Sequence, residues 1–140
     1  MTINIDNRMR LDGKTAVITG GGSGIGAACA AVFASAGAHV VVAGRRLEAV
    51  ERIAQEIGGT AVACDVTDYA QVVSLFEQAR AVSGSLDVLV NNAGIPGPVA
   101  PVAEVDLDAW RQCIDINVFG ALHCMKVAAQ IMRGRGAVPS

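Results

Sequence analysis

Glycine occupies five of the seven positions from 20 to 26, directly after the apolar, β-branched run of residues 14–19. An alanine-rich stretch over residues 23–36 follows, and Gly37 stands where a helix would end. A glycine loop between a strand and a helix lets the backbone approach a phosphate, while the helix directs free N–H groups at it. A tight turn with no ligand is the alternative, but it would not require so many glycines.

The rest of the chain continues this alternation of strands and helices. The run H-V-V-V-A at residues 39–43 is too continuously apolar for a half-exposed strand, and residues 60–64 and 86–90 are two further expected strands. Apolar spacing predicts a helix over residues 47–57 and another from a cap at Thr67 or Asp68 to about residue 82. A glycine- and proline-rich loop over residues 94–101 precedes a long helix, capped by Asp106 and covering residues 107–132.

The order of these elements predicts an α/β fold. Right-handed crossovers place the strands in one parallel sheet with helices on both faces. The 140 residues make about one domain, residues 1–140, and four strands are fewer than the roughly six of common doubly wound sheets. We therefore expect a Rossmann-like, doubly wound parallel sheet of four strands and four helices, incomplete at its C-terminal end.

The composition excludes several classes of partner. Eleven Lys and Arg residues against thirteen Asp and Glu leave no basic excess for a nucleic-acid backbone, and the few aromatic residues offer little stacking surface. No apolar run approaches the ~20 residues of a membrane span, and the first ten residues lack the apolar segment of a secretory signal. Neither nucleic acid nor a membrane is an expected partner.

The cysteines and histidines do not form a metal-binding pattern. Cys29, Cys64, Cys113 and Cys124 are widely spaced and include no C-x-x-C pair, which argues against both a zinc site and a disulfide scaffold. The two histidines also lack metal-ligand spacing. We expect no metal site, and free thiols buried in a protein of the reducing cytoplasm.

Four motifs, in order, resemble those of the short-chain dehydrogenase/reductase family. The segment T-G-G-G-S-G-I-G at residues 19–26 is similar to the family's cofactor loop, T-G-x-x-x-G-I-G. The pair D-V at residues 65–66 resembles the motif after its third strand that contacts adenine, and N-N-A-G at residues 91–94 resembles the end of its fourth strand. D-I-N-V-F-G at residues 115–120 resembles the helix that carries the asparagine of the catalytic tetrad. The resemblance extends over residues 14–132.

The resemblance implies a nicotinamide dinucleotide site and hydride transfer to or from a small alcohol or ketone. It implies cofactor contacts from the glycine loop and the ends of later strands, namely Gly20, Gly22, Ser23, Gly24, Ile25, Gly26, Asp65, Val66, Asn92, Ala93 and Gly94. Arg45 is a further expected cofactor contact because of its charge. Asn117 is the catalytic residue that it implies, as an amide that holds a proton-relay water.

The polar residues of these motifs also have purely structural explanations. Asp65 can accept a hydrogen bond from adenine or cap the turn that follows it. One of Asn91 and Asn92 can hold the sheet together, and we expect Asn92 to contact the cofactor. Because an asparagine inside a helix competes for backbone hydrogen bonds, Asn117 is either catalytic or a tolerated residue beside a kink.

The end of the second expected strand decides between NAD and NADP. An aspartate there would accept both ribose hydroxyls of NAD and repel a 2′-phosphate. Gly44 occupies this position, and Arg45 can form a bidentate, charge-assisted pair with a phosphate. Alternatively, Arg45 and Arg46 solvate the strand end or stack on adenine. We expect NADP(H), with NAD(H) as the other possibility.

The catalytic serine, tyrosine and lysine of the family have no counterparts in these 140 residues. The single tyrosine, Tyr69, is followed four positions later by Val73, so no Tyr-x-x-x-Lys is present. Ser140 follows Pro139 and no complete strand, so we do not assign it as the catalytic serine. We expect the chain alone to be inactive, whether it is a truncated product, a fragment or a half-length protein. A non-catalytic dinucleotide-binding module or assembly subunit is the alternative function.

Two features predict a homo-oligomer or a strand-exchanged dimer. The strand at residues 86–90 would lack its usual neighbour and so present a bare, apolar edge. The long helix carries apolar residues near one side, and in the family this helix commonly packs against a second subunit. These residues are Trp110, Ile114, Val118, Leu122 and Met125.

Overall fold

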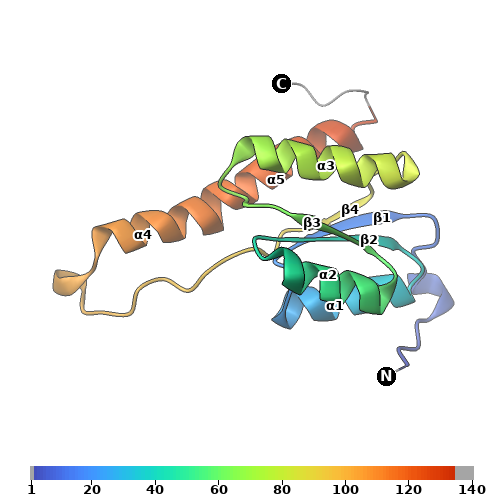
Figure 1. The fold of residues 1–140 in the computed structure, drawn as a ribbon, viewed down its shortest axis with the longest axis horizontal. Helices are drawn as coiled ribbons and strands as arrows, with labels where there is room; N and C mark the ends of the chain where they lie inside the picture. The colour runs from blue at the N-terminus through green and yellow to red at the C-terminus, as the bar shows by residue number, and fades with distance from the viewer. Residues whose placement is uncertain (1, 135–140) are drawn as a thin grey trace.

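Four short apolar strands form one parallel sheet at the centre of the computed structural model, which describes residues 2–134 (Figure 1). The strands are β1 (Thr15–Thr19), β2 (His39–Gly44), β3 (Thr60–Ala63) and β4 (Val88–Val90), in the spatial order β3-β2-β1-β4. In the register of the sheet, Val17 of β1 lies between Val41 of β2 and Leu89 of β4. The expected parallel α/β sheet is confirmed.

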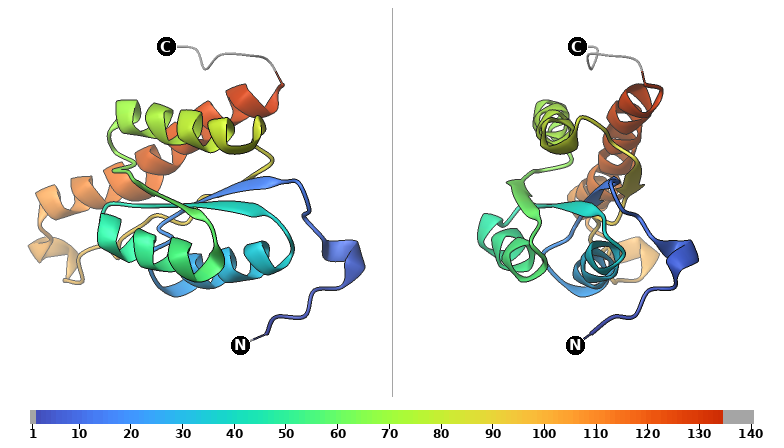
Figure 2. Two further views of the ribbon diagram at one scale, coloured as in Figure 1. Left: turned by 45° about the vertical axis from the view of Figure 1, so that its right-hand side comes forward. Right: turned by 90° about the vertical axis from the view of Figure 1, so that its right-hand side faces the viewer.

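Helices cover both faces of this sheet, as an end-on view shows (Figure 2). Helices α1 (Gly24–Ser35) and α2 (Leu47–Ile57) lie on one face, and α3 (Tyr69–Ser83) and α5 (Ala121–Met132) lie on the other. Each face has its own apolar core, one around Ile18, Val42 and Val50, the other around Val17 and Phe76. The doubly wound arrangement predicted from the sequence is confirmed.

Two of the helices have the side-chain caps predicted from the sequence. Asp68 caps α3 by accepting a hydrogen bond from the backbone N–H of Gln71, at 3.3 Å. Asp106 caps α4 (Leu107–Ile114) through the N–H groups of Asp108 and Ala109. Each carboxylate satisfies backbone donors that the helix itself leaves unpaired.

The long helix expected over residues 107–132 is not a single α-helix. It consists of α4, a π-helical segment η3 (Asp115–Gly120) and α5, which follow one another without a break (Figure 1). Single π turns within α-helices are often found at functional sites. In this segment the side chain of Asn117 bonds the loop after β4, and Gly120 packs against Val66.

Short 3-10 turns, η1 (Asn7–Met9) and η2 (Val102–Glu104), precede β1 and α4. Within residues 2–134 no helix combines the length and apolarity needed to cross a bilayer. Residues 135–140, including Pro139 and Ser140, lie outside the described part of the chain.

Candidate functional site

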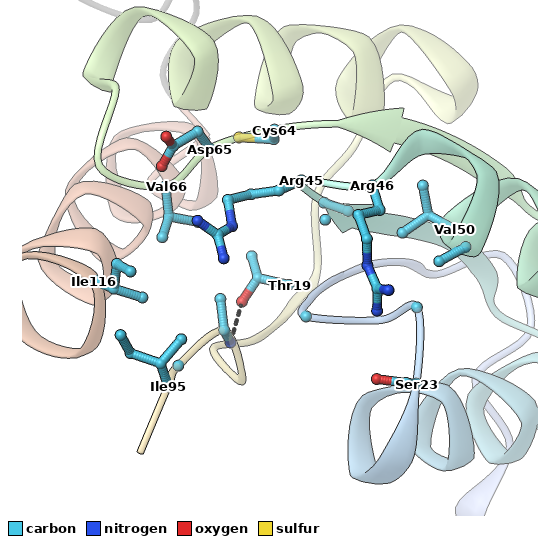
Figure 3. A pocket seen from close by; sticks show the side chains of 17 residues that line it. Thr19, Ser23, Arg45, Arg46, Val50, Cys64, Asp65, Val66, Ile95 and Ile116 are labelled. Atoms are coloured by element: carbon cyan, nitrogen blue, oxygen red, sulfur yellow. Dashed lines mark hydrogen bonds between the residues drawn. The ribbon is translucent and has the colours of Figure 1, made fainter. Parts of the chain in front are cut away.

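A pocket of about 380 Å³ opens where the carboxyl ends of the strands meet (Figure 3). Beside β1 the chain passes from one face of the sheet to the other, and such switch points are where α/β sheets bind ligands. Eight residues that the sequence assigned to cofactor binding line this pocket, namely Gly20, Gly22, Ser23, Arg45, Asp65, Val66, Ala93 and Gly94. The structure therefore brings together residues up to 74 positions apart.

The glycine loop is held close to the start of α1. Gly20 has a left-handed φ of 62°, and a Cβ there would stand 2.9 Å from Nδ2 of Asn92. At Gly26, on the first turn of α1, a Cβ would overlap the carbonyl oxygen of Gly20 and lie 2.6 Å from Nδ2 of Asn92. Larger residues would therefore push the loop away from the helix, so these two glycines are required by the geometry.

Thr19 and Asn92 connect the end of β4 to this loop. The buried hydroxyl of Thr19 accepts hydrogen bonds from the backbone N–H groups of Asn92 and Ala93, both at 3.0 Å. The side-chain Nδ2 of Asn92 donates to the carbonyl oxygens of Thr19 and Gly20, at 3.2 and 3.1 Å. Asn91 is exposed and its Nδ2 donates to the carbonyl of Ala121.

Five of the expected site residues lie outside the pocket lining, namely Gly24, Ile25, Gly26, Asn92 and Asn117. Both asparagines act through neighbours that do line it. Asn92 holds Gly20, as described above, and Oδ1 and Nδ2 of Asn117 bond the N–H and carbonyl of Ile95, at 2.8 and 2.7 Å. A direct cofactor contact from Asn92 and a water held by Asn117 stay predictions.

Asp65 both caps its own turn and lines the pocket. Its Oδ1 accepts hydrogen bonds from the hydroxyl and the backbone N–H of Thr67, at 2.7 and 3.0 Å. These bonds lower the pKa of the Asp65 carboxyl, and the positive charge of Arg45 lowers it further. The side chain is therefore an ionised acceptor at neutral pH. From this one position Asp65 both caps the turn and presents its carboxylate to the pocket.

Two neighbouring arginines line the same pocket, and their side chains point in different directions (Figure 3). The side chain of Arg45 reaches across toward Asp65 and Val66, whereas that of Arg46 extends toward Ser23 in the glycine loop. Both are exposed. Two cations therefore line the pocket at the point where the second strand ends.

Helices α1 and α2 begin at the pocket, and neither has a side-chain cap. Ser23 and Arg46 are their N-cap residues, and neither side chain bonds the helix backbone. The aspartate-capped helices α3 and α4 contrast with this arrangement. The free N–H groups at the N-termini of α1 and α2 carry a partial positive charge that is suited to binding phosphate groups.

Nine lining residues were not among the residues assigned from the sequence. They are Thr19, Ala43, Gly44, Arg46, Ala49, Val50, Cys64, Ile95 and Ile116. Thr19 and Ile116 lie within recognised motifs and Ile95 directly follows one, so the motifs themselves are the signal that could have found these three residues. Ala49 and Val50 have no such signal in the sequence, because their apolar spacing only indicates the buried side of a helix.

Cys64, which lines the pocket, contributes no ionised group to it. All four are free thiols, and burial, together with the nearby Asp65 and Asp68 carboxylates, raises the pKa of Cys64 to about 11. Over the described residues, no three or more His, Cys, Asp or Glu side chains gather in a way that would hold a metal ion.

Comparison with known proteins places this arrangement in a recognised group. The profile of a family described as short chain dehydrogenase matches residues 14–138. A 2,5-dichloro-2,5-cyclohexadiene-1,4-diol dehydrogenase of Sphingobium indicum is 44% identical over 128 residues, which are 89% of this chain and 51% of that protein. The 7alpha-hydroxysteroid dehydrogenase of Escherichia coli is 40% identical over 138 residues, 95% of this chain and 53% of that protein.

A solved structure shows the same similarity in three dimensions. A short-chain type dehydrogenase/reductase from Mycobacterium marinum superposes with a TM-score of 0.84 at 38% identity. The match covers 92% of this chain and 53% of that one. The chain therefore spans about half the length of the relatives that it matches.

Proposed function

The chain belongs to the short-chain dehydrogenase family, and from this premise we propose that it forms the cofactor-binding part of an NAD(P)-dependent oxidoreductase. Such an enzyme transfers a hydride between the nicotinamide of the cofactor and a carbonyl or alcohol substrate. The observation that carries the proposal is the pocket at the strand ends, between the glycine loop and the wall formed by Asp65 and Val66.

The residues present fit a dinucleotide along the length of this pocket. The close approach of Gly20 and Gly26 provides space for a pyrophosphate, and the uncapped ends of α1 and α2 provide N–H donors for it. Asp65 supplies an ionised acceptor for an adenine amino group, and Ala93, Gly94 and Ile95 form the opposite side. When bound, the nicotinamide ring supplies or accepts the hydride.

NADP(H) is the cofactor that we propose for this pocket, with NAD(H) as the alternative. Gly44 leaves space where an acidic side chain would repel a 2′-phosphate, and Arg45 and Arg46, which follow it, line the same pocket. The Arg45→Ala variant is expected to weaken NADPH binding roughly 10- to 100-fold, the value of a charge-assisted hydrogen bond, and to leave NADH binding unchanged. Titration of cofactor fluorescence with the wild-type and variant chains measures both dissociation constants.

A matched control is Arg52→Ala, which removes the same charge from an exposed position of α2 outside the pocket lining. It should bind NADPH as the wild type does. Equal dissociation constants of the wild type for NADPH and NADH would contradict the cofactor preference. The absence of saturable binding of either cofactor would contradict the proposed function itself.

Catalysis is a separate part of the proposal. Asn117 is proposed as the chain's member of the catalytic tetrad. It bonds the backbone of Ile95 and would hold a water that relays a proton. These 140 residues contain no Tyr-x-x-x-Lys, so the chain by itself is proposed to bind the cofactor without turning over substrate. A non-catalytic dinucleotide-binding module or assembly subunit is the second candidate. The absence of Tyr-x-x-x-Lys from these 140 residues also favours this candidate.

We also propose a homo-oligomer in the cytoplasm. Within residues 2–134, β4 pairs only with β1, so its outer edge is unpaired, and the apolar residues Trp110, Ile114 and Leu122 are 41–49% exposed along one helical path. The four free thiols suit a reducing compartment. Light scattering is expected to give at least a dimer mass, and a monomer over a wide concentration range would contradict this.

A further inference from the structure

The wall of the pocket that carries Asp65 and Val66 is the loop between β3 and α3. Part of this loop is held by residues close to it in the sequence. The backbone N–H of Asp65 donates to Oε1 of Gln71 at 2.9 Å, and the carboxylate of Asp65 accepts from Thr67. These local bonds fix Asp65 but leave the backbone carbonyl of Val66 to be satisfied from elsewhere.

A histidine 57 positions away supplies that contact. Nδ1 of His123, on α5, lies 2.7 Å from the carbonyl oxygen of Val66. Because a carbonyl oxygen only accepts, Nδ1 must carry the proton. One turn earlier, a Cβ at Gly120 would overlap Cγ2 of Val66, so the helical path packs directly against this residue. Both the backbone and the side chain of Val66 are therefore held from the same side.

The ring of His123 is itself held in place. It is half-buried and meets the ring of Tyr69 edge to face, with centroids 5.4 Å apart and planes at 66°. Nζ of Lys126 stands 5.3 Å from the centre of the same Tyr69 ring. The cluster lies outside the pocket lining, so none of its three side chains forms the pocket surface.

We propose that His123 is a positioning residue for the adenosine end of the cofactor, because it holds the Val66 carbonyl and keeps this wall in its binding conformation. The inference rests on the proposed dinucleotide site. A wall that is already ordered loses little conformational freedom when the ligand binds, and affinity increases accordingly. Without the histidine donor, the backbone carbonyl of the buried Val66 would need another hydrogen-bond donor, or the loop would rearrange.

Two substitutions at His123 separate the hydrogen bond from simple packing. In His123→Leu the donor is lost, and the dissociation constants for NADPH and for adenosine 2′,5′-bisphosphate should both rise roughly three- to tenfold. In His123→Asn an amide N–H stands near the position of Nδ1, so affinity should return toward that of the wild type, although the contact with Tyr69 is lost. Lys126→Met, which removes only the charge beside Tyr69, should bind as the wild type does.

Each result has a defined meaning. Equal losses in His123→Leu and His123→Asn would show that packing alone matters, and a loss confined to NADPH would place the effect at the nicotinamide end. Either result would overturn the inference, as would wild-type affinity in His123→Leu. If the wild-type chain binds no dinucleotide, the proposed function fails instead.

A measurement on the unaltered chain tests the contact even where a variant does not fold. The ¹⁵N shifts of the His123 ring, recorded at a pH where the ring is neutral, should show a protonated Nδ1 and an unprotonated Nε2. The opposite tautomer cannot donate from Nδ1 to the Val66 carbonyl and would overturn the inference.

Discussion

Replacing Gly26 with alanine is expected to raise the dissociation constant for NADPH at least roughly tenfold and to lower the free energy of unfolding by about 1–3 kcal/mol. The added methyl group would overlap the carbonyl oxygen of Gly20 and lie 2.6 Å from Nδ2 of Asn92. Relief requires the glycine loop to move away from α1. That movement increases the distance between the N–H groups of the loop and those at the start of the helix. The phosphates of the cofactor could then no longer bond both sets of donors as closely.

Gly84→Ala is the control for this variant. Gly84 ends α3 with a φ of 80°, and a Cβ there has no neighbour within 4 Å. Its replacement should cost about 1–2 kcal/mol of stability through backbone strain alone and leave NADPH binding unchanged. Denaturant unfolding and cofactor titration of both variants measure the two effects. If Gly26→Ala binds NADPH as Gly84→Ala does, the close packing of loop and helix is not what creates the phosphate site.

Much of the fold could be predicted because its signals are local in the sequence. The continuous apolar run of β2 indicates burial on both faces, and Asp68 and Asp106 mark the helix starts that the structure shows. The π-helical turn at Asp115–Gly120 could not be predicted in this way. It accompanies contacts that Asn117 and Gly120 make with Ile95 and Val66, which are distant in sequence.

In the candidate site, too, features with a local sequence signal could be predicted and features that depend on contacts between distant residues could not. Motifs identify the glycine loop and Asp65, because each needs a particular residue type at a strand end. The role of Thr19 as acceptor for the backbone of Asn92, 73 residues away, depends on the pairing of β1 with β4. His123 likewise has no motif of its own, and its function becomes visible only when α5 is packed against the Val66 loop.

The 140-residue chain is expected to bind NADPH without catalysing hydride transfer at a rate normal for an enzyme. A carbonyl that accepts hydride develops alkoxide charge, which needs a hydrogen-bond donor and then a proton. One general acid alone contributes roughly 10²–10⁴-fold. Tyr69 stands at the start of α3 against His123, outside the pocket lining, and Asn117 carries an amide that does not titrate near neutral pH.

The rate of hydride transfer is measured as oxidation of NADPH by a panel of ketones and as reduction of NADP by alcohols. The protein used has its mass confirmed. A full-length relative serves as the positive control for the assay. Fusion of the second half of a relative chosen because it contains the serine and Tyr-x-x-x-Lys expected for the family should restore turnover if this chain is the cofactor-binding part of an oxidoreductase. Continued NADPH binding with no turnover in the fusion would favour a non-catalytic module. Normal turnover by the 140 residues alone would show that their catalytic groups lie elsewhere than in the family's tetrad.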